Sequence, residues 1–225
     1  LASPSIVASS AIAGKIFPPR DFNNIEPIAE IKINKRSEEI NVNVSLLDGF
    51  PKSLEGEIIF CPQDNLNTDG IYPGKYTYID DFTPEQMAEV VMENYDPEFG
   101  RIVKTGDILV GGYNFGTGSS REQAATSLMY RGIKMVFAGS FSQTYKRNAI
   151  NNGFLVIEAT NLLSDLLKEF GNQALSVKTG WKISVNFSDS CIIHKDKKYD
   201  ISPVGIAAQE LILTKGLENW VKENI

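Results

Sequence analysis

The stretch with the clearest potential for chemistry is a glycine-rich segment that ends in two serines and an arginine. It covers residues 111–121, with the sequence GGYNFGTGSSR. Glycines let a backbone turn sharply and approach a ligand closely, and the free N–H groups of a following helix attract an anion. An arginine can hold a carboxylate through two parallel hydrogen bonds. The segment therefore predicts a carboxylate-binding loop that ends in Ser119, Ser120 and Arg121.

The same spacing fits other interpretations. Ser119 is placed for an ordinary helix cap, with Glu122 completing a capping box. A nucleotide P-loop would need Gly-Lys-Ser or Gly-Lys-Thr after the glycines, and the segment has neither. The intervals between Gly112, Gly116 and Gly118 also differ from those of a dinucleotide fingerprint. Spacing alone leaves the helix cap and the anion-binding loop as the two hypotheses.

Metal chemistry is limited by the cysteines, because the chain has only Cys61 and Cys191. They lie far apart without C-x-x-C spacing, whereas a zinc knuckle or an iron–sulfur cluster needs at least three suitably spaced ligands. We therefore expect no metal site in this chain by itself. With no disulfide framework and no secretory signal in the sequence, reduced thiols are favoured over a disulfide. The one histidine, His194, falls in a predicted hairpin, and we expect it to be a surface residue.

Short strands and amphipathic helices are expected to position these groups. Apolar runs predict buried strands at 57–61, 107–111, 133–138 and 154–157. Helical spacing predicts helices at 84–94, 121–131, 142–151 and 161–170. Three further runs predict an antiparallel meander at 181–187, 190–194 and 198–201, followed by helices at 204–214 and 217–221. This order favours a layered α/β domain with a mixed sheet.

The first part of the chain has a different organisation. Apolar residues at helical spacing, Pro4 in the first turn and Gly14 at the end predict a short helix within residues 1–16. Residues 17–27 have three prolines and no periodicity, which predicts an extended linker over 17–53. An alternating run at 40–44 within it could be a strand. The first residue is a leucine, which suggests a processed product or an excised piece.

The amino-acid composition limits which class of protein this chain can belong to. The chain has 225 residues, of which 42% are apolar and 22% charged, as is typical of a soluble globular domain. Its net charge of −6 repels polyphosphate, so a nucleic-acid partner is disfavoured. No apolar run approaches the roughly 20 residues that span a bilayer, so we expect no membrane partner.

Several linked motifs resemble the swivel domain of the aconitase superfamily. They follow one another as NFGTGSSREQAA at 114–125, RGI at 131–133, AGSF at 138–141 and RNAINNG at 147–153. Upstream, residues 64–73 are similar to the family segment D-x-x-x-T-D-x-I-x-P. The resemblance runs from about residue 54 to 159 and is fainter beyond. Residues 1–15 resemble the helix that closes the preceding catalytic domain of the family.

The resemblance implies a fold, a reaction and a cofactor. The fold would be a layered β/β/α swivel domain with a mixed sheet over 54–225, after a linker at 17–53 and the end of a catalytic domain at 1–16. The reaction would be that of a hydro-lyase that moves a hydroxyl between adjacent carbons of a di- or tricarboxylic acid. The family's 4Fe-4S cluster, held by domains 1–3 of the same protein, acts as a Lewis acid on the leaving hydroxyl. This chain would then carry half of an active site.

The resemblance also implies roles for single residues. Ser119 matches the serine base that takes the α-carbon proton, and Asp69 matches an active-site aspartate. Ser120 and Arg121 match residues that bind a substrate carboxylate. A serine base without a histidine requires a dry, donor-rich loop that stabilises its alkoxide.

Two segments indicate one branch of the family. Residues 72–87 and 216–221 are similar to the fungal homoaconitase branch, which interconverts homoaconitate and homoisocitrate in lysine synthesis in the mitochondrial matrix. In prokaryotic relatives, an arginine after the P-G-[KR]-Y turn meets the longer substrate's distal carboxylate. The matching stretch here contains no arginine. The candidate substrate-binding residues are therefore Lys75, Tyr76, Thr77 and Tyr78.

Two further functions stay open. The swivel part of 3-isopropylmalate dehydratase shares the Gly-Ser-Ser-Arg loop, and a non-catalytic module would use that loop only to bind an anion. Outside the loop, Asp64 is expected to cap a turn. Arg147 lies on a predicted helix, where it faces solvent or serves as an anchor.

We expect the isolated chain to be colourless and to lack hydratase activity, because a cubane cluster needs at least three protein thiolates. The check is visible absorbance and iron content after reconstitution with iron and sulfide. Iron–sulfur absorbance with stoichiometric metal binding would contradict this expectation.

Overall fold

The computed structural model describes residues 3–18, 44–171 and 173–225, in two compact units, Leu1–Asn41 and Val42–Ile225. The first unit contains helix α1, Pro4–Ala13. The Ser3 side chain accepts a hydrogen bond from the Ile6 N–H at its start, and Gly14 ends it in the left-handed conformation with φ 65°. The predicted helix is therefore confirmed, while its assignment to a preceding catalytic domain stays a prediction. The predicted strand at 40–44 falls almost entirely outside the described residues.

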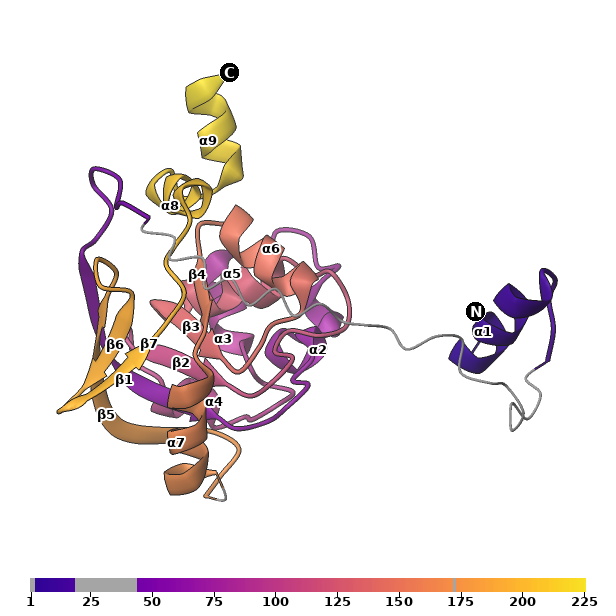
Figure 1. Ribbon diagram of the computed structural model, residues 1–225, viewed down its shortest axis with the longest axis horizontal. Helices are drawn as coiled ribbons and strands as arrows, with labels where there is room; N and C mark the ends of the chain where they lie inside the picture. Colours follow the sequence, from indigo (N-terminus) through magenta and orange to yellow (C-terminus); the bar gives the residue numbers. More distant parts are fainter. Residues whose placement is uncertain (1–2, 19–43, 172) are drawn as a thin grey trace, which may run out of the picture. The chain divides into compact units, whose positions relative to one another are not determined.

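A single mixed sheet organises the second unit (Figure 1). In the described part of the chain it has seven strands in the order β4-β3-β2-β1-β5-β6-β7. The parallel strands are β1 (Ser53–Cys61), β2 (Ile108–Gly111), β3 (Met135–Ala138) and β4 (Leu155–Glu158). The antiparallel meander consists of β5 (Val177–Asn186), β6 (Cys191–His194) and β7 (Lys197–Asp200). The predicted α/β class with a mixed sheet is confirmed.

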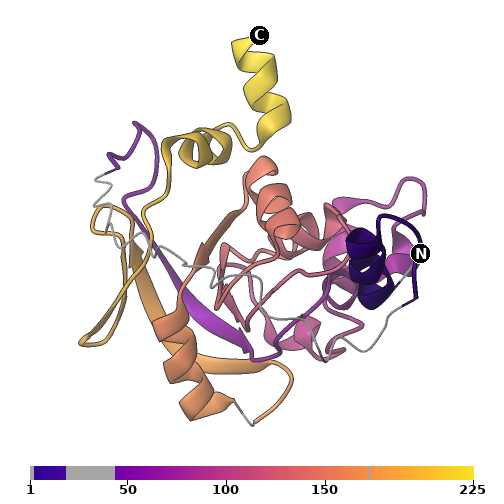
Figure 2. The same ribbon diagram turned by 45° about the vertical axis from the view of Figure 1, so that its right-hand side comes forward.

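Helices cover the sheet and connect its strands. The longer ones are α5 (Gln123–Tyr130), α6 (Gln143–Asn151), α7 (Thr160–Phe170), α8 (Ile206–Leu213) and α9 (Leu217–Asn224). The shorter ones are α2 (Thr68–Ile71), a 3₁₀ turn (Gly74–Tyr76), α3 (Pro84–Val90) and α4 (Phe99–Ile102). In two views, α9 extends away from the rest of its domain (Figures 1 and 2). No helix in the described ranges has the length and apolar character needed to cross a membrane.

The predicted helix at 84–94 is too long. It ends at Val90 because Val91 is extended and Met92 takes a left-handed backbone conformation with φ 64°. The Met92 N–H donates to the Ile71 carbonyl oxygen at 2.7 Å, and its side chain is fully buried. Apolar spacing alone does not separate such a turn into the core from one more helical turn.

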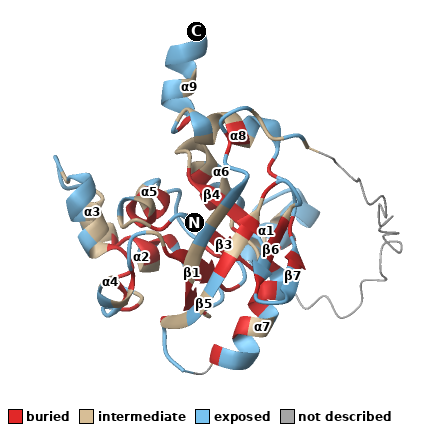
Figure 3. Ribbon diagram, turned by 90° about the vertical axis from the view of Figure 1, so that its left-hand side faces the viewer, coloured by how far each residue is buried: buried red, intermediate tan, exposed pale blue. Residues whose placement is uncertain are grey.

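Two hydrophobic layers hold the sheet, one on each face. In β1, Ile59 and Cys61 join the layer built with α5 and α6, while Ile58 and Phe60 join the layer built with α7 and the meander. Successive strand side chains point to opposite faces, so parallel strands covered on both sides become continuous apolar runs. That is why these strands were predictable. Figure 3 shows the buried residues on the strands and the inner sides of the helices, with α9 mostly exposed.

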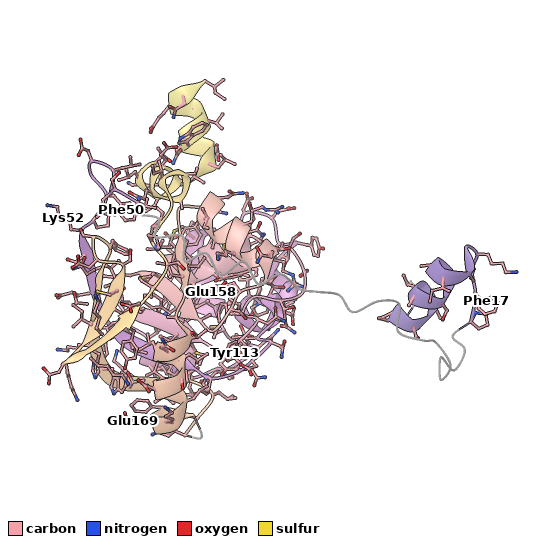
Figure 4. The ribbon with its side chains drawn as sticks, in the orientation of Figure 1. Phe17, Phe50, Lys52, Tyr113, Glu158 and Glu169 are labelled. Atoms are coloured by element: carbon pink, nitrogen blue, oxygen red, sulfur yellow. The ribbon has the colours of Figure 1, made fainter. Side chains whose placement is uncertain are left out.

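Packing of the domain begins before residue 54. Phe50 is 5% exposed, and its ring meets the Phe187 ring edge-on at 5.4 Å. The Leu47 N–H donates to Oε1 of Gln209, a fully buried residue of α8, at 2.8 Å. Figure 4 labels Phe50 near the start of β1. These contacts attach residues 47–50 to the core, and residues 19–43 of the predicted linker lie outside the described ranges.

The expectation that His194 is a surface residue is wrong. It is 7% exposed, its ring stacks on Trp181 at 4.1 Å, and its Nδ1 lies 3.0 Å from the Lys182 carbonyl oxygen. His194 ends β6 within the sheet, and its ring is buried against Trp181 of the neighbouring strand β5. Both cysteines are free and buried.

The two-layer core predicts unequal effects for neighbouring leucines of α7. Leu166 is fully buried, and Leu167 is 39% exposed. We expect Leu166→Ala to lower the free energy of unfolding by about 2–5 kcal/mol through lost burial and cavity formation. Leu167→Ala is the matched control and should stay within about 0.5 kcal/mol of the original chain, since the site is at the surface. Urea denaturation of the 225-residue chain measures both, and equal effects would contradict the described packing.

Candidate active site

The site forms where two loops follow the carboxyl ends of the neighbouring parallel strands β1 and β2. Backbone hydrogen bonds join the loops: the Asn65 N–H donates to the Tyr113 oxygen and the Gly116 N–H to the Leu66 oxygen, both at 2.8 Å. Asn67 and Thr117 form an isolated parallel bridge. These bonds bring the 64–73 motif beside the 111–121 motif, so both sequence motifs lie in one place.

Glycine is required at two points of the second loop. Gly116 has φ 73°, and a Cβ there would overlap the Tyr145 ring. Gly118 has φ 103°, a conformation that L side chains rarely adopt. The ring of Phe115, in the loop itself, packs against the rings of Phe141 and Tyr145. The loop is therefore held by close packing as well as by its hydrogen bonds.

Ser119 does not cap the helix that follows it. The helix α5 begins at Gln123, and its N-cap residue Glu122 makes no side-chain capping hydrogen bond. Ser119 is exposed, and its Oγ lies 3.1 Å from Oγ1 of Thr68. The helix predicted from 121 thus starts later, and Ser119 lies outside the first turn, to which the helix dipole is mainly confined. The capping hypothesis is wrong, and the Ser119 hydroxyl is open to a ligand.

Arg121 and Asp69 form the main ion pair of the site. Nη1 of Arg121 donates to Oδ1 of Asp69 at 2.8 Å and to the Tyr72 carbonyl oxygen at 3.2 Å. The Gly74 N–H and the Asn94 side chain also donate to Asp69, at 2.9 and 3.0 Å. The hydrogen bonds from Arg121 and then from Gly74 lower the pKa of the Asp69 carboxyl below its ordinary value. Asp69 is therefore held as a carboxylate that fixes the Arg121 guanidinium.

Gly74 leaves room for this pair. A Cβ at this position would lie 2.8 Å from Nη2 of Arg121 and 2.9 Å from Oδ1 of Asp69. Any side chain here would displace one of the two charged groups. The glycine of the Pro-Gly-Lys-Tyr turn is thus explained by close approach to the ion pair.

The four residues expected to contact substrate lie in different surroundings. Lys75 Nζ lies 2.7 Å from Oε1 of Glu93, and the Tyr76 hydroxyl donates to Oε2 of Glu93 at 3.0 Å. The hydrogen bond from Lys75 lowers the pKa of the Glu93 carboxyl. The Thr77 Oγ1 atom is buried, whereas Tyr78 is 92% exposed. Lys75 and Tyr76 are therefore held by an acidic partner, and Tyr78 is the most open of the four.

The structure places the remaining candidates around the loops. Ser120 is exposed beside Ser119. Asp64 accepts a hydrogen bond from the Tyr113 N–H at 2.7 Å and thereby joins the two loops. Arg147 is exposed on α6.

Sequence reasoning missed three residues that shape the site: Thr68 beside Ser119, Asn94 beside Asp69 and Glu93 beside Lys75. The sequence could have pointed to Thr68, since it directly precedes Asp69 in the family motif at 64–73. The sequence could not have pointed to Asn94 and Glu93, because no sequence pattern relates them to the loop residues that they contact.

The residues present do not fit an iron–sulfur cluster. Cys61 lies in β1 with Sγ 3.5 Å from the Ser176 hydroxyl, and burial raises the pKa of its thiol to about 12. Cys191 is buried in β6. Within the ranges that the structure describes, no group of three histidine, cysteine or acidic residues could hold a metal ion. Cluster ligands are thiolates, and neither buried thiol is suited to that role.

Comparison with known proteins identifies close relatives. The aconitase C-terminal domain family matches residues 27–162, more than half of the chain. A mitochondrial homoaconitase from Candida albicans is 44% identical over 250 residues, and one from Mycosarcoma maydis is 44% identical over 273 residues. Both alignments include the whole of this chain, but only 36% and 37% of the relatives. The chain spans little more than a third of the length of these curated relatives.

A solved structure matches the fold. The crystal structure of a 3-isopropylmalate dehydratase from Methanocaldococcus jannaschii superposes with a TM-score of 0.63 and is 34% identical. The match covers 76% of this chain and 94% of that chain. The fold expected from the sequence motifs is thereby confirmed.

The ion pair at the centre of the site predicts a change in titration. We expect Arg121→Gln to raise the pKa of Asp69 toward the ordinary aspartate value, because its largest stabilising hydrogen bond is lost. Lys75→Gln is the matched control: it should raise the pKa of Glu93 and leave that of Asp69 unchanged. Carboxyl-carbon NMR titration of the chain measures both groups. An unchanged Asp69 pKa in Arg121→Gln would refute the described pairing.

Proposed function

The chain belongs to the aconitase family through its C-terminal domain, and we propose that it is the swivel-type part of a homoaconitase-like hydro-lyase. The relatives that support this proposal carry the name mitochondrial homoaconitase. The substrate would be homoaconitate, interconverted with homoisocitrate in lysine synthesis in the mitochondrial matrix. Because this chain spans about a third of those relatives, the activity requires the rest of the protein.

The observation that carries the proposal is an open serine hydroxyl two residues before an arginine whose guanidinium is fixed by Asp69. Ser119 would take the proton from the substrate carbon next to the one that bears the hydroxyl. The electron pair of that C–H bond forms the carbon–carbon double bond as the hydroxyl leaves the adjacent carbon, and a Lewis acid held by the rest of the protein would accept that hydroxyl. In the hydration direction, the Ser119 hydroxyl returns the proton.

Arg121 would bind a substrate carboxylate, assisted by Ser120. Among the described residues, the hydrogen bonds that hold the guanidinium come from Nη1. The guanidinium has five N–H donors in a planar fork, so its remaining donors can bind a carboxylate in two-point fashion. Asp69 keeps the fork in place, and we assign it a positioning role, because Arg121, Gly74 and Asn94 already donate to its oxygens.

The 4Fe-4S cluster that the family implies would be held by the part of the protein outside this chain. The described residues offer it no ligand set. That remaining part is also the partner against which the open Ser119 face would close. Closure excludes water, which strengthens the electrostatic interactions inside the site.

3-Isopropylmalate dehydration is the second candidate function. The solved structure of that name supports it, with 34% identity over almost all of its length. The homoaconitases are more similar, at 44% identity over the whole of this chain. The rates of the cluster-loaded full-length enzyme with homoaconitate and 3-isopropylmalate separate the two candidates.

The test of the proposed function is Ser119→Ala in the cluster-loaded full-length enzyme. We expect kcat to fall by about 10²–10⁴-fold, the usual contribution of a general base, with unfolding little changed because Ser119 caps no helix. Ser164→Ala, at an exposed position of α7, is the matched control and should keep full activity. Arg121→Ala should raise KM as well as lower kcat, since a carboxylate grip acts in ground and transition states.

Three outcomes would count against the proposal. Near-normal turnover of Ser119→Ala would remove the serine base. Preference for 3-isopropylmalate would select the second candidate. An enzyme that binds tricarboxylates but turns over neither acid would indicate a module that only binds anions.

A further inference from the structure

Ser119 has one side-chain neighbour that the reaction scheme above does not use. Thr68, the first residue of α2, places its Oγ1 3.1 Å from the Ser119 Oγ. The two hydroxyls differ sharply in surroundings, because Thr68 is 2% exposed and Ser119 is exposed. The pair therefore joins a buried hydroxyl to one that faces the substrate side.

Burial determines which hydroxyl donates. A hydroxyl has one hydrogen to give, and a buried donor without an acceptor is costly. Within the described ranges, the Ser119 Oγ is the hydrogen-bond partner of the Thr68 hydroxyl. Ser119 can direct its own hydrogen to water or to a ligand, since it is exposed. Thr68 is therefore the donor and Ser119 the acceptor.

The position of Thr68 is fixed by its backbone. Its N–H donates to the Thr117 oxygen at 2.8 Å, and its carbonyl oxygen accepts from the Tyr72 N–H at 2.9 Å. The Asn67 side chain caps the short helix by accepting from the Gly70 N–H at 2.7 Å. The donor is thus in place before any substrate arrives, which is the condition for stabilising a charge without reorganisation.

We propose that Thr68 is a positioning residue for Ser119: its hydroxyl orients the serine oxygen and stabilises the deprotonated form that accepts the substrate proton. The inference rests on the proposed function of Ser119 as the base. A hydrogen bond to a charged oxygen is stronger than one to a neutral hydroxyl. Thr68 therefore favours the alkoxide over the hydroxyl, a task that a histidine would perform in other serine-dependent sites.

The experiment compares three substitutions in the cluster-loaded full-length enzyme. Thr68→Val removes the hydroxyl at nearly constant shape, and we expect it to lower kcat about 100-fold, as loss of one preorganised donor does. KM should change little, because substrate contacts through Arg121 are retained. The acidic limb of the pH profile of kcat should move to higher pH, since the alkoxide becomes harder to form.

Two variants separate this role from a structural one. Thr68→Ser keeps the donor and should restore most of the activity and the original pH profile. Thr126→Val is the matched control, because Thr126 is 8% exposed and its hydroxyl bonds to the Glu122 oxygen of its own helix. It removes a buried threonine hydroxyl from the same domain and should leave kcat and the pH profile unchanged.

The outcomes distinguish the inference from the proposed function. Normal kcat in Thr68→Val, or equal losses in Thr68→Val and Thr68→Ser, would overturn the role of the hydroxyl. If Thr68→Val does not fold, Thr68→Ala removes the same donor and takes its place in the comparison with Thr68→Ser. Wild-type enzyme that turns over neither acid would refute the proposed function itself, and the inference about Thr68 would fall with it.

Discussion

The site depends on backbone hydrogen bonds between the loops after β1 and β2. The bonds from Asn65, Gly116 and Thr68 to the facing loop join two motifs that are far apart in the sequence. Because they use main-chain groups, they set the distance between Ser119 and Asp69 without depending on particular side chains. They do depend on Gly116, whose Cα packs against the Tyr145 ring. The geometry of the loop thus depends on the packing of Gly116 against Tyr145, and neither residue is a proposed reacting group.

The charges of the site are paired within the chain before a substrate binds. Asp69 fixes Arg121, and Glu93 holds Lys75 and Tyr76. Such exposed pairs contribute little to stability, so their value lies in orientation. A guanidinium already held at one nitrogen loses less conformational freedom when a carboxylate binds its other donors. The same pairing lowers the pKa of the Asp69 carboxyl.

The sequence predicted the strands, the meander and the site motifs, and failed where contacts between distant loops decide the structure. The strands β1 to β4 are buried on both faces and therefore appear as apolar runs. The sequence around Ser119 fits both a helix cap and a ligand-binding loop. Only the start of α5 at Gln123 distinguishes the two hypotheses. Met92 and His194 were misjudged because their turns into the core are set by neighbours that local periodicity does not contain.

Selection between substrates of different length would involve other residues of the site than catalysis does. The segment expected to discriminate between substrates has Lys75 and Tyr76 bound to Glu93 and the Thr77 oxygen buried, which leaves Tyr78 as its most open side chain. A distal carboxylate that approached Lys75 would share the ammonium group with Glu93, whose Oε1 lies 2.7 Å from Nζ. Two carboxylates close to one ammonium group repel each other. Under the proposed function, recognition of a longer acid would draw on the Tyr78 hydroxyl here together with cations from the rest of the protein.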